Sequence, residues 1–249
     1  MAKIVLRNGK LAAVTSKGKA LQFQFASDSN LILPVAAAQQ FTSNFTFEMW
    51  VFPQQNESSR RRMGLIQTNS FILWIAETAA PAGQAGRLEL YNYNGASGSG
   101  PVLPNNTWSH IAVSVDTTSA AGSANIKVYV NGDIQAISTL TTPFVANTSN
   151  TYIGAISSDG ARRYRGMIAD LRLWTATRTA SQIAANFRTM GALTSTTGLV
   201  GRYLFNEASG STATDSSPAA NHGTFGASTA RIGNTAPVTT STFTAFQTN

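Results

Sequence analysis

Cysteine is absent from the 249 residues of this chain, and charged residues make up only 12% of it. Without a thiol there is no disulfide, no thiolate nucleophile and no sulfur-ligated zinc site, so packing alone must stabilise the fold. Small polar residues separate the short apolar runs and take the place of surface charge. This composition is typical of a globular all-β protein.

Acidic residues are also scarce, since 11 Asp and Glu stand against 18 Lys and Arg, for a formal net charge of +7. The positive balance reflects few acids more than many bases, so we expect no nucleic-acid partner. No apolar run reaches the ~18 residues that a membrane-spanning helix requires. The longest candidate, residues 31–38, contains Pro34, so no membrane insertion is expected.

Short apolar runs at regular spacing predict strands along most of the chain. They fall at residues 44–53, 64–75, 87–93, 108–115, 126–137, 152–156, 166–174 and 199–205, with another near Phe225. Both faces of the run at 44–53 are largely apolar, so we expect this strand to be central and covered on both sides. Asn131 and Gly132 tolerate positive φ and predict a hairpin within residues 126–137.

One short surface helix is predicted from about Ala180 to Met190. Thr179 supplies the N-cap, Gln182 completes a capping box and Gly191 ends the helix. Many short strands with a single helix indicate an all-β fold, a two-sheet antiparallel jelly-roll sandwich.

Three stretches of sequence carry a family resemblance. They are ALQFQFASDSNLILP with NFTFEMWVFP (within residues 20–53), NTWSHIAVSVDTTSAAGSANIKVYVNGDI (106–134) and YRGMIADLRLWTATRTASQIAANF (164–187). Together they resemble the laminin G-like, concanavalin A-like lectin/glucanase superfamily of jelly-roll domains. The resemblance implies a sandwich at residues 20–226, between a basic N-terminal arm or first strand (1–19) and a C-terminal tail (227–249).

Paired carboxylates mark the glucanase branch of this superfamily. Acids at alternate positions of one strand place an acid and a nucleophile about 5 to 5.5 Å apart in one groove. No two acids of this chain stand two or four positions apart, and neither His110 nor His222 lies in a triad context. We predict no enzymatic activity and no catalytic residues, although a pair drawn from different strands stays open.

The resemblance implies one cofactor, a structural calcium ion at the rim of the sandwich. Asp28 and Asp170 match acidic positions of the family's calcium motifs, but residues 24–26 replace its usual Asp-Gly. Calcium takes about six to eight oxygen ligands, so a missing ligand weakens the site. The alternative for Asp170 is a structural role, in which its carboxylate accepts hydrogen bonds from backbone amides.

Two arginine clusters supply the candidate binding residues. They are Arg60, Arg61 and Arg62 in one loop, and Arg162, Arg163 and Arg165 beside Tyr164 in another. Either they are solvated loop charges, or they form a basic rim that binds an anionic glycan or an acidic protein through guanidinium forks. Candidate sugar-stacking rings, some of which must be core, are Tyr91, Tyr93, Trp108 and Tyr164.

Two functions remain. The favoured interpretation is a non-catalytic repeated surface subunit of a larger assembly, such as a phage virion decoration or fibre protein, with assembly proteins or further copies of itself as partners. The arms at 1–19 and 227–249, which resemble docking tails, favour it, as do the lack of cysteine and of a secretion signal. Such a protein is made in the cytoplasm and displayed on an extracellular particle. The alternative is a lectin-like module that binds an anionic or neutral polysaccharide.

Overall fold

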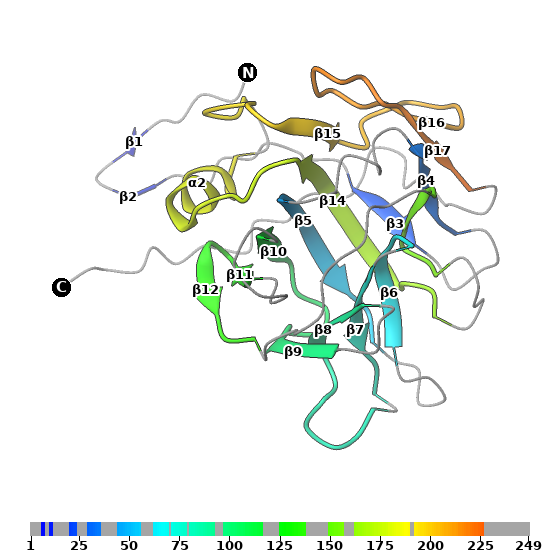
Figure 1. The fold of residues 1–249 in the computed structure, drawn as a ribbon, viewed down its shortest axis with the longest axis vertical. Coiled ribbons are helices and arrows are strands. Elements are labelled where there is room, and N and C mark those ends of the chain that lie inside the picture. Colours follow the sequence, from blue (N-terminus) through cyan, green and yellow to red (C-terminus); the bar gives the residue numbers. More distant parts are fainter. Residues whose placement is uncertain are drawn as a thin grey trace.

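Two antiparallel sheets pack face to face in the computed structural model, as Figure 1 shows. The structure describes residues 6–7, 10–11, 20–23, 29–35, 44–55, 62–69, 71–78, 80–92, 97–116, 125–137, 149–156, 162–189 and 192–226. The predicted all-β sandwich is confirmed, and its architecture is that of a jelly roll.

The first sheet has seven strands and holds the predicted central strand. Its order is β12 (Asp133–Gln135), β11 (Asn125–Val130), β10 (Ser109–Asp116), β5 (Phe45–Pro53), β14 (Gly166–Trp174) and β15 (Leu199–Tyr203), and β3 (Leu21–Phe23) also pairs with β14. Because β5 lies between β10 and β14 and is buried on both faces, its predicted central position is confirmed.

The second sheet has eight strands. Its order is β16 (Thr212–Ala213), β17 (Gly223–Phe225), β4 (Leu31–Leu33), β13 (Thr151–Ile153), β6 (Arg62–Gln67), β7 (Phe71–Ala76), β8 (Arg87–Asn92) and β9 (Ser97–Val102). A separate pair joins β1 (Leu6–Arg7) and β2 (Lys10–Leu11).

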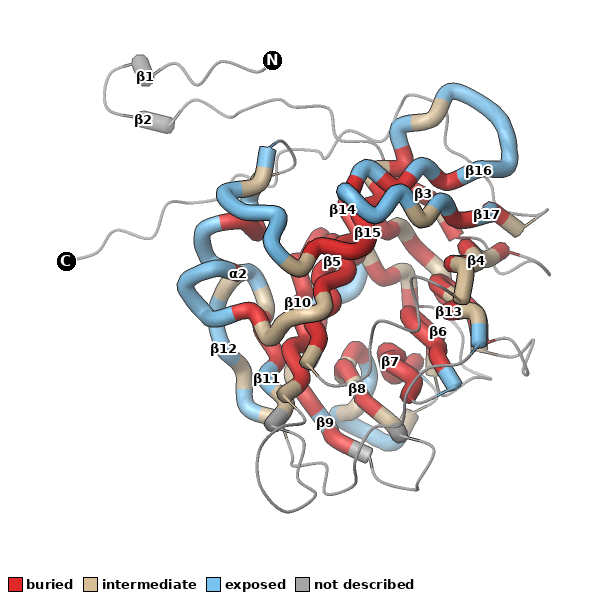
Figure 2. Tube along the Cα trace, turned by 45° about the horizontal axis from the view of Figure 1, so that its top comes forward, coloured by how far each residue is buried: buried red, intermediate tan, exposed pale blue. Residues whose placement is uncertain are grey.

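The main core fills the space between the sheets. Alternate residues of a strand point to opposite faces, so Phe45 and Phe47 of β5 meet Phe71 of β7 there, with ring centroids 5.2 to 5.6 Å apart. Figure 2 shows the buried residues concentrated along β5, β10 and β14 on one side and β6 to β8 on the other. Both sheets therefore present a second, outer face on which other groups collect.

Helix α2 (Ala180–Asn186) packs on the outer face of the seven-stranded sheet. Ile183 contacts Ala112 and Tyr129 there. The predicted capping box of Thr179 and Gln182 is confirmed. No helix in the described ranges is long and apolar enough to cross a membrane.

Two predicted boundaries were wrong. Residues 64–75 form two strands, β6 and β7, because Thr68 closes a turn in which its N–H donates to the Phe71 carbonyl and its Oγ1 accepts from the Phe71 N–H, both at 2.9 Å. Helix α2 ends at Asn186, before the predicted Met190, because side chains of the sheet beneath it donate hydrogen bonds to the carbonyls at its end. The Asn131-Gly132 hairpin is confirmed, with φ of 53° and 92°.

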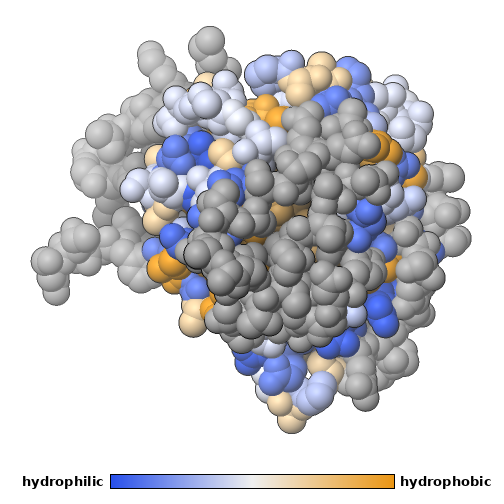
Figure 3. All heavy atoms as spheres, viewed as in Figure 1, coloured by the Kyte–Doolittle hydropathy of each residue, from blue (hydrophilic) through white to orange (hydrophobic). Residues whose placement is uncertain are grey.

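Hydrophobic side chains on the face shown in Figure 3 lie in small, separate patches among hydrophilic ones. Within the described ranges, the large hydrophobic residues that are mostly exposed are Val102 at 50% and Ile134 at 60%, on different sheets. The surface features pursued below are therefore the polar and charged groups of the described residues.

Candidate functional site

An arginine–aromatic cluster lies on the outer face of β6, β7 and β8. Its members are Arg62, Trp74, Glu89, Tyr91 and Arg162. Strand register places Trp74 opposite Glu89 on β8 and opposite Gly64 on β6. Since neighbouring residues of β7 point into the core, Trp74 points away from it.

Glu89 fixes two members of this cluster through one oxygen. Its Oε2 accepts a hydrogen bond from Arg62 Nε at 2.6 Å and another from Trp74 Nε1 at 2.7 Å. The guanidinium carbon of Arg62 then lies 4.7 Å from the centre of the Trp74 ring, within the range of a cation–π contact. On the same face, the ring of Tyr91 stacks against Trp74 with centroids 5.7 Å apart.

Arg162 reaches the same indole from a different part of the chain. Its backbone carbonyl accepts from the N–H of Gly64 at 2.9 Å, and its guanidinium carbon lies 5.5 Å from the Trp74 ring centre. A Cβ at position 64 would lie 2.9 Å from that carbonyl oxygen and 2.7 Å from Ile156. The lack of a side chain at Gly64 thus lets the second arginine segment lie across β6.

The structure brings one arginine of each predicted cluster to a single ring. Arg62 and Arg162 are 100 positions apart in sequence, yet both contact Trp74. Arg163 and Arg165 are partly exposed on the same segment as Arg162. The other predicted residues Arg60, Arg61, Asp28 and Tyr93 lie outside the described residues.

Tyr164 does not belong to this surface, so its predicted place on a basic rim was wrong. Its side chain is fully buried, its ring packs edge-on against Phe23, and its hydroxyl donates to the Met167 carbonyl at 3.3 Å. Its neighbours Arg163 and Arg165 are partly exposed, whereas Tyr164 points into the core. Trp108 is also buried and packs against Phe52, so neither ring is offered to a ligand.

Asp170 lies at a bulge in β14, with a φ of 43° and 1% exposure. Its Oδ1 accepts from Arg202 Nε at 3.0 Å, and its Oδ2 accepts from Arg172 Nη2 and from Arg202 Nη2. Burial raises its pKa, but the hydrogen bonds and charges of Arg172 and Arg202 outweigh burial and hold the pKa below its usual value.

These surroundings do not fit a calcium ion at Asp170. Two guanidinium groups already pair with both carboxylate oxygens, and their charge repels a divalent cation. The described residues also contain no group of three or more His, Asp or Glu side chains that is placed to hold a metal. The carboxylate of Asp170 pairs with arginines, in place of the expected backbone amides. A calcium site involving Asp28 stays a prediction.

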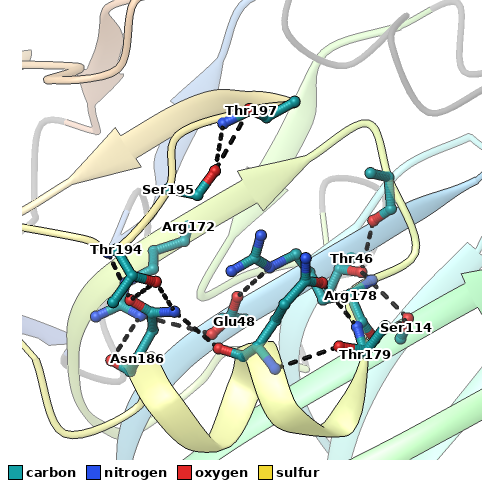
Figure 4. Close-up of polar contacts among 12 residues, drawn as sticks. Thr46, Glu48, Ser114, Arg172, Arg178, Thr179, Asn186, Thr194, Ser195 and Thr197 are labelled. Atoms are coloured by element: carbon teal, nitrogen blue, oxygen red, sulfur yellow. Dashed lines mark hydrogen bonds and ion pairs between the residues drawn. The ribbon is translucent and has the colours of Figure 1, made fainter.

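A buried charge network lies under α2. Figure 4 shows Glu48 of β5 between Arg172 and Arg178, alongside the helix. Glu48 Oε2 lies 3.5 Å from Arg172 Nη1, and Oε1 lies 4.0 Å from Arg178 Nε. Burial raises the pKa of Glu48, and the nearby arginines offset this only in part. The guanidinium of Arg178 also lies over the Trp174 ring, at 3.9 Å.

His110 completes the network as a neutral residue. Its Nε2 lies 3.6 Å from Glu48 Oε2, and its ring packs edge-on against Trp50. Burial, followed by the charge of Arg172, lowers the pKa of His110 to about 3. The buried imidazole is thus held uncharged, and its ring packs against aromatic neighbours.

Sequence reasoning missed Trp74 and Glu89. The available signal was alternation: in the runs FILWIA and RLELYN, Trp74 and Glu89 occupy outward positions between core residues. The prediction of residues 64–75 as a single strand obscured which side chains of β7 point outward. The pairing of Glu48 with Arg172 had no local signal, since it depends on the register between β5 and β14.

Two packed antiparallel sheets with one helix on an outer face define a jelly-roll sandwich of the lectin-like kind. The chain belongs to the concanavalin A-like lectin/glucanase superfamily, because the laminin G family of that superfamily matches residues 25–184. The resemblance drawn from the sequence is thus confirmed. No curated protein matches the chain as a relative.

Solved structures share this fold at low identity. A Bacteroides ovatus protein, provisionally described as carbohydrate-binding, has a TM-score of 0.63 and 23% identity over 83% of this chain, which spans 57% of that protein. Domain 4 of AbnA, an extracellular arabinanase of Geobacillus stearothermophilus solved with arabinotriose, has a TM-score of 0.50 and 22% identity over 70% of this chain and 79% of its own. A heptameric pentraxin of Limulus polyphemus has a TM-score of 0.51 and 16% identity over 72% and 86%.

Proposed function

We propose that this chain is a non-catalytic carbohydrate-binding module. The observation that carries the proposal is the arginine–aromatic cluster, in which Trp74, Tyr91 and two guanidinium groups lie together on the outer face of β6 to β8. Ligand-binding sites commonly combine aromatic side chains with a few fixed polar groups. The Bacteroides ovatus and AbnA structures, described as carbohydrate-binding and solved with arabinotriose respectively, support this function.

The comparisons favour carbohydrate binding over the assembly-subunit interpretation of the sequence, since none of them points to a virion protein. The larger assembly, further copies of the chain and display on a particle therefore remain predictions. Polysaccharide is the partner that the proposal requires.

Two buried acids support a non-catalytic role. Glu48 and Asp170 are the carboxylates that two neighbouring strands bring near one arginine, Arg172. A glycosidase needs two carboxylates on either side of the scissile bond with room for sugar and water. Both acids are at most 1% exposed beneath the α2 segment, and each is paired with arginine.

Affinity electrophoresis against laminarin, agarose, alginate and carrageenan tests the proposal. We expect at least one polysaccharide to retard the protein and none to release reducing ends. Tyr91→Ala should weaken the retardation, because it removes a ring from the cluster. Ile134→Ala, at an exposed position on the other sheet, should leave it unchanged. Failure of all four to bind would contradict the proposal, and turnover of any one would contradict the non-catalytic role.

A further inference from the structure

The arginine–aromatic cluster differs from an open aromatic platform. Neutral sugars stack on exposed aromatic faces, but Trp74 is only 6% exposed, because guanidinium groups and Tyr91 cover its ring. The groups that the cluster presents outward are therefore guanidinium planes beside one partly exposed tyrosine. This arrangement selects for a ligand that pairs with cations.

Arg62 is held in place before any ligand arrives. Its side chain is 37% exposed, its Nε bonds to Glu89, and its plane rests over Trp74. Neither terminal nitrogen of Arg62 donates to another described residue, so both keep their donors for a ligand. Fixing the fork through Nε reduces the side-chain entropy that is lost on binding.

Several guanidinium groups gather at the cluster. Arg62 pairs with Glu89, and the guanidinium of Arg162 lies near the same Trp74 ring. Arg163 and Arg165 add two further partly exposed cations on the segment that carries Arg162. Guanidinium forks match carboxylates and sulfates through charge-assisted hydrogen bonds, which are roughly twice as strong as neutral ones.

We infer that this cluster binds acidic polysaccharides, with Arg62 and Arg162 contacting the carboxylate or sulfate groups of the glycan. The inference rests on the proposed carbohydrate-binding function and narrows it to one class of ligand. Neutral segments of the same polysaccharide would contact Tyr91. Because carboxylate and sulfate share this chemistry, only binding measurements can separate uronate from sulfated glycans.

Titration calorimetry of the full-length chain with alginate, carrageenan, agarose and laminarin tests the inference. We expect the acidic pair to bind more tightly than the neutral pair, and alginate compared with carrageenan identifies the oxyanion. Arg62→Gln and Arg162→Gln should each weaken binding about tenfold, as the loss of charge-assisted hydrogen bonds does. The matched control is Arg188→Gln, which removes the same charge from an exposed position after α2.

Two further measurements keep the test decisive if a glutamine variant folds poorly. Arg62→Lys retains the charge but loses the fork and should bind with intermediate affinity. The affinity of the unaltered protein should fall as salt rises from 100 to 500 mM, because exposed charges are screened over about 10 Å or less at such ionic strengths.

The possible failures are distinguishable. Binding of neutral glycans alone, unaffected by salt or by Arg62→Gln, would overturn this inference and leave the proposed function standing. Acidic glycan binding that Arg188→Gln weakens as much as Arg62→Gln would overturn the site. No binding of any polysaccharide would overturn the proposed function together with the inference.

Discussion

A single acidic residue on each sheet decides how the outer face of that sheet is used. On the eight-stranded sheet, Glu89 is partly exposed and turns one oxygen toward Arg62 and Trp74, which fixes a surface. On the seven-stranded sheet, Glu48 is fully buried, so its charge has to be offset by Arg172 and Arg178. A buried charge is tolerated only where such partners exist. The first acid thus supports a binding surface and the second a packed interior.

His110 gives a prediction at this scale that depends on pH. Its pKa is about 3 in the folded protein and about 6.5 in an unfolded chain, so the folded state disfavours protonation. Its contribution to stability is complete above pH 6.5 and is lost as pH falls toward 3. His110→Phe keeps the packing against Trp50 and Phe187 and removes this loss.

Urea unfolding at several pH values between 7 and 4 provides the measurement. The unaltered protein should lose up to about 1.4 kcal/mol more unfolding free energy per pH unit than His110→Phe in that window. Parallel pH profiles for the two proteins would contradict a buried, neutral His110.

At the scale of elements, α2 owes its position and its length to the sheet beneath it. The last carbonyls of a helix have no partner within the helix. Here Arg172 donates to the carbonyls of Asn186, at 3.1 Å, and Thr189, and Trp50 Nε1 donates to that of Phe187, at 3.1 Å. An arginine at this end also interacts favourably with the helix dipole. These contacts explain why the helix ends at Asn186, before the stop predicted at Gly191.

Replacing Arg172 should therefore undock α2. Arg172→Met leaves the acids Glu48 and Asp170 short of a buried partner and removes the arginine donors to the carbonyls of Asn186 and Thr189, at an expected cost of about 3–5 kcal/mol in unfolding free energy. Arg188→Met is the matched control. Arg188 is exposed just after α2, and its guanidinium carbon lies 4.9 Å from the centre of the Phe187 ring. Its cost should be below about 1 kcal/mol.

Chemical denaturation measures both costs, and hydrogen exchange of the α2 amides reports whether the helix has detached. Equal, small losses for the two variants would show that the network under α2 does not hold the helix.

The whole molecule is a two-sheet sandwich with two charged outer faces. One core cluster draws on both sheets. The outer face of the seven-stranded sheet is covered by α2, while the arginine–aromatic cluster on the opposite sheet keeps an exposed arginine. The strands of both sheets run from Leu21 to Phe225. The proposed binding surface therefore needs neither end of the chain.

A truncated chain of residues 20–226 tests this independence. It should fold, and it should bind polysaccharide with the affinity of the full chain, because the contacts among the described residues of the arginine–aromatic cluster come from within it. Size-exclusion chromatography and calorimetry of both chains supply the measurement. Loss of self-association on truncation, with no glycan binding by either chain, would restore the assembly-subunit interpretation.

Local patterns were enough to predict the sandwich. Alternation in residues 44–53 indicated a central strand, Asn131-Gly132 indicated a hairpin, and Thr179 with Gln182 indicated a capped helix; each pattern acts over a few residues and is confirmed. The same reading pointed to Asp170 as notable, but not to its arginine partners. Family motifs likewise indicated the superfamily, which depends on the spacing of core positions.

The sequence by itself determined the fold class, the family and the supply of arginine, because periodicity and composition are properties of neighbouring residues. Only the tertiary structure decided which of those charges meet. Arg62 and Arg162 share Trp74, and Glu48 faces Arg172, through strand register between segments far apart in the chain. Register is set by the packing of both sheets at once, since a shift of one residue would turn every side chain of a strand to the opposite face.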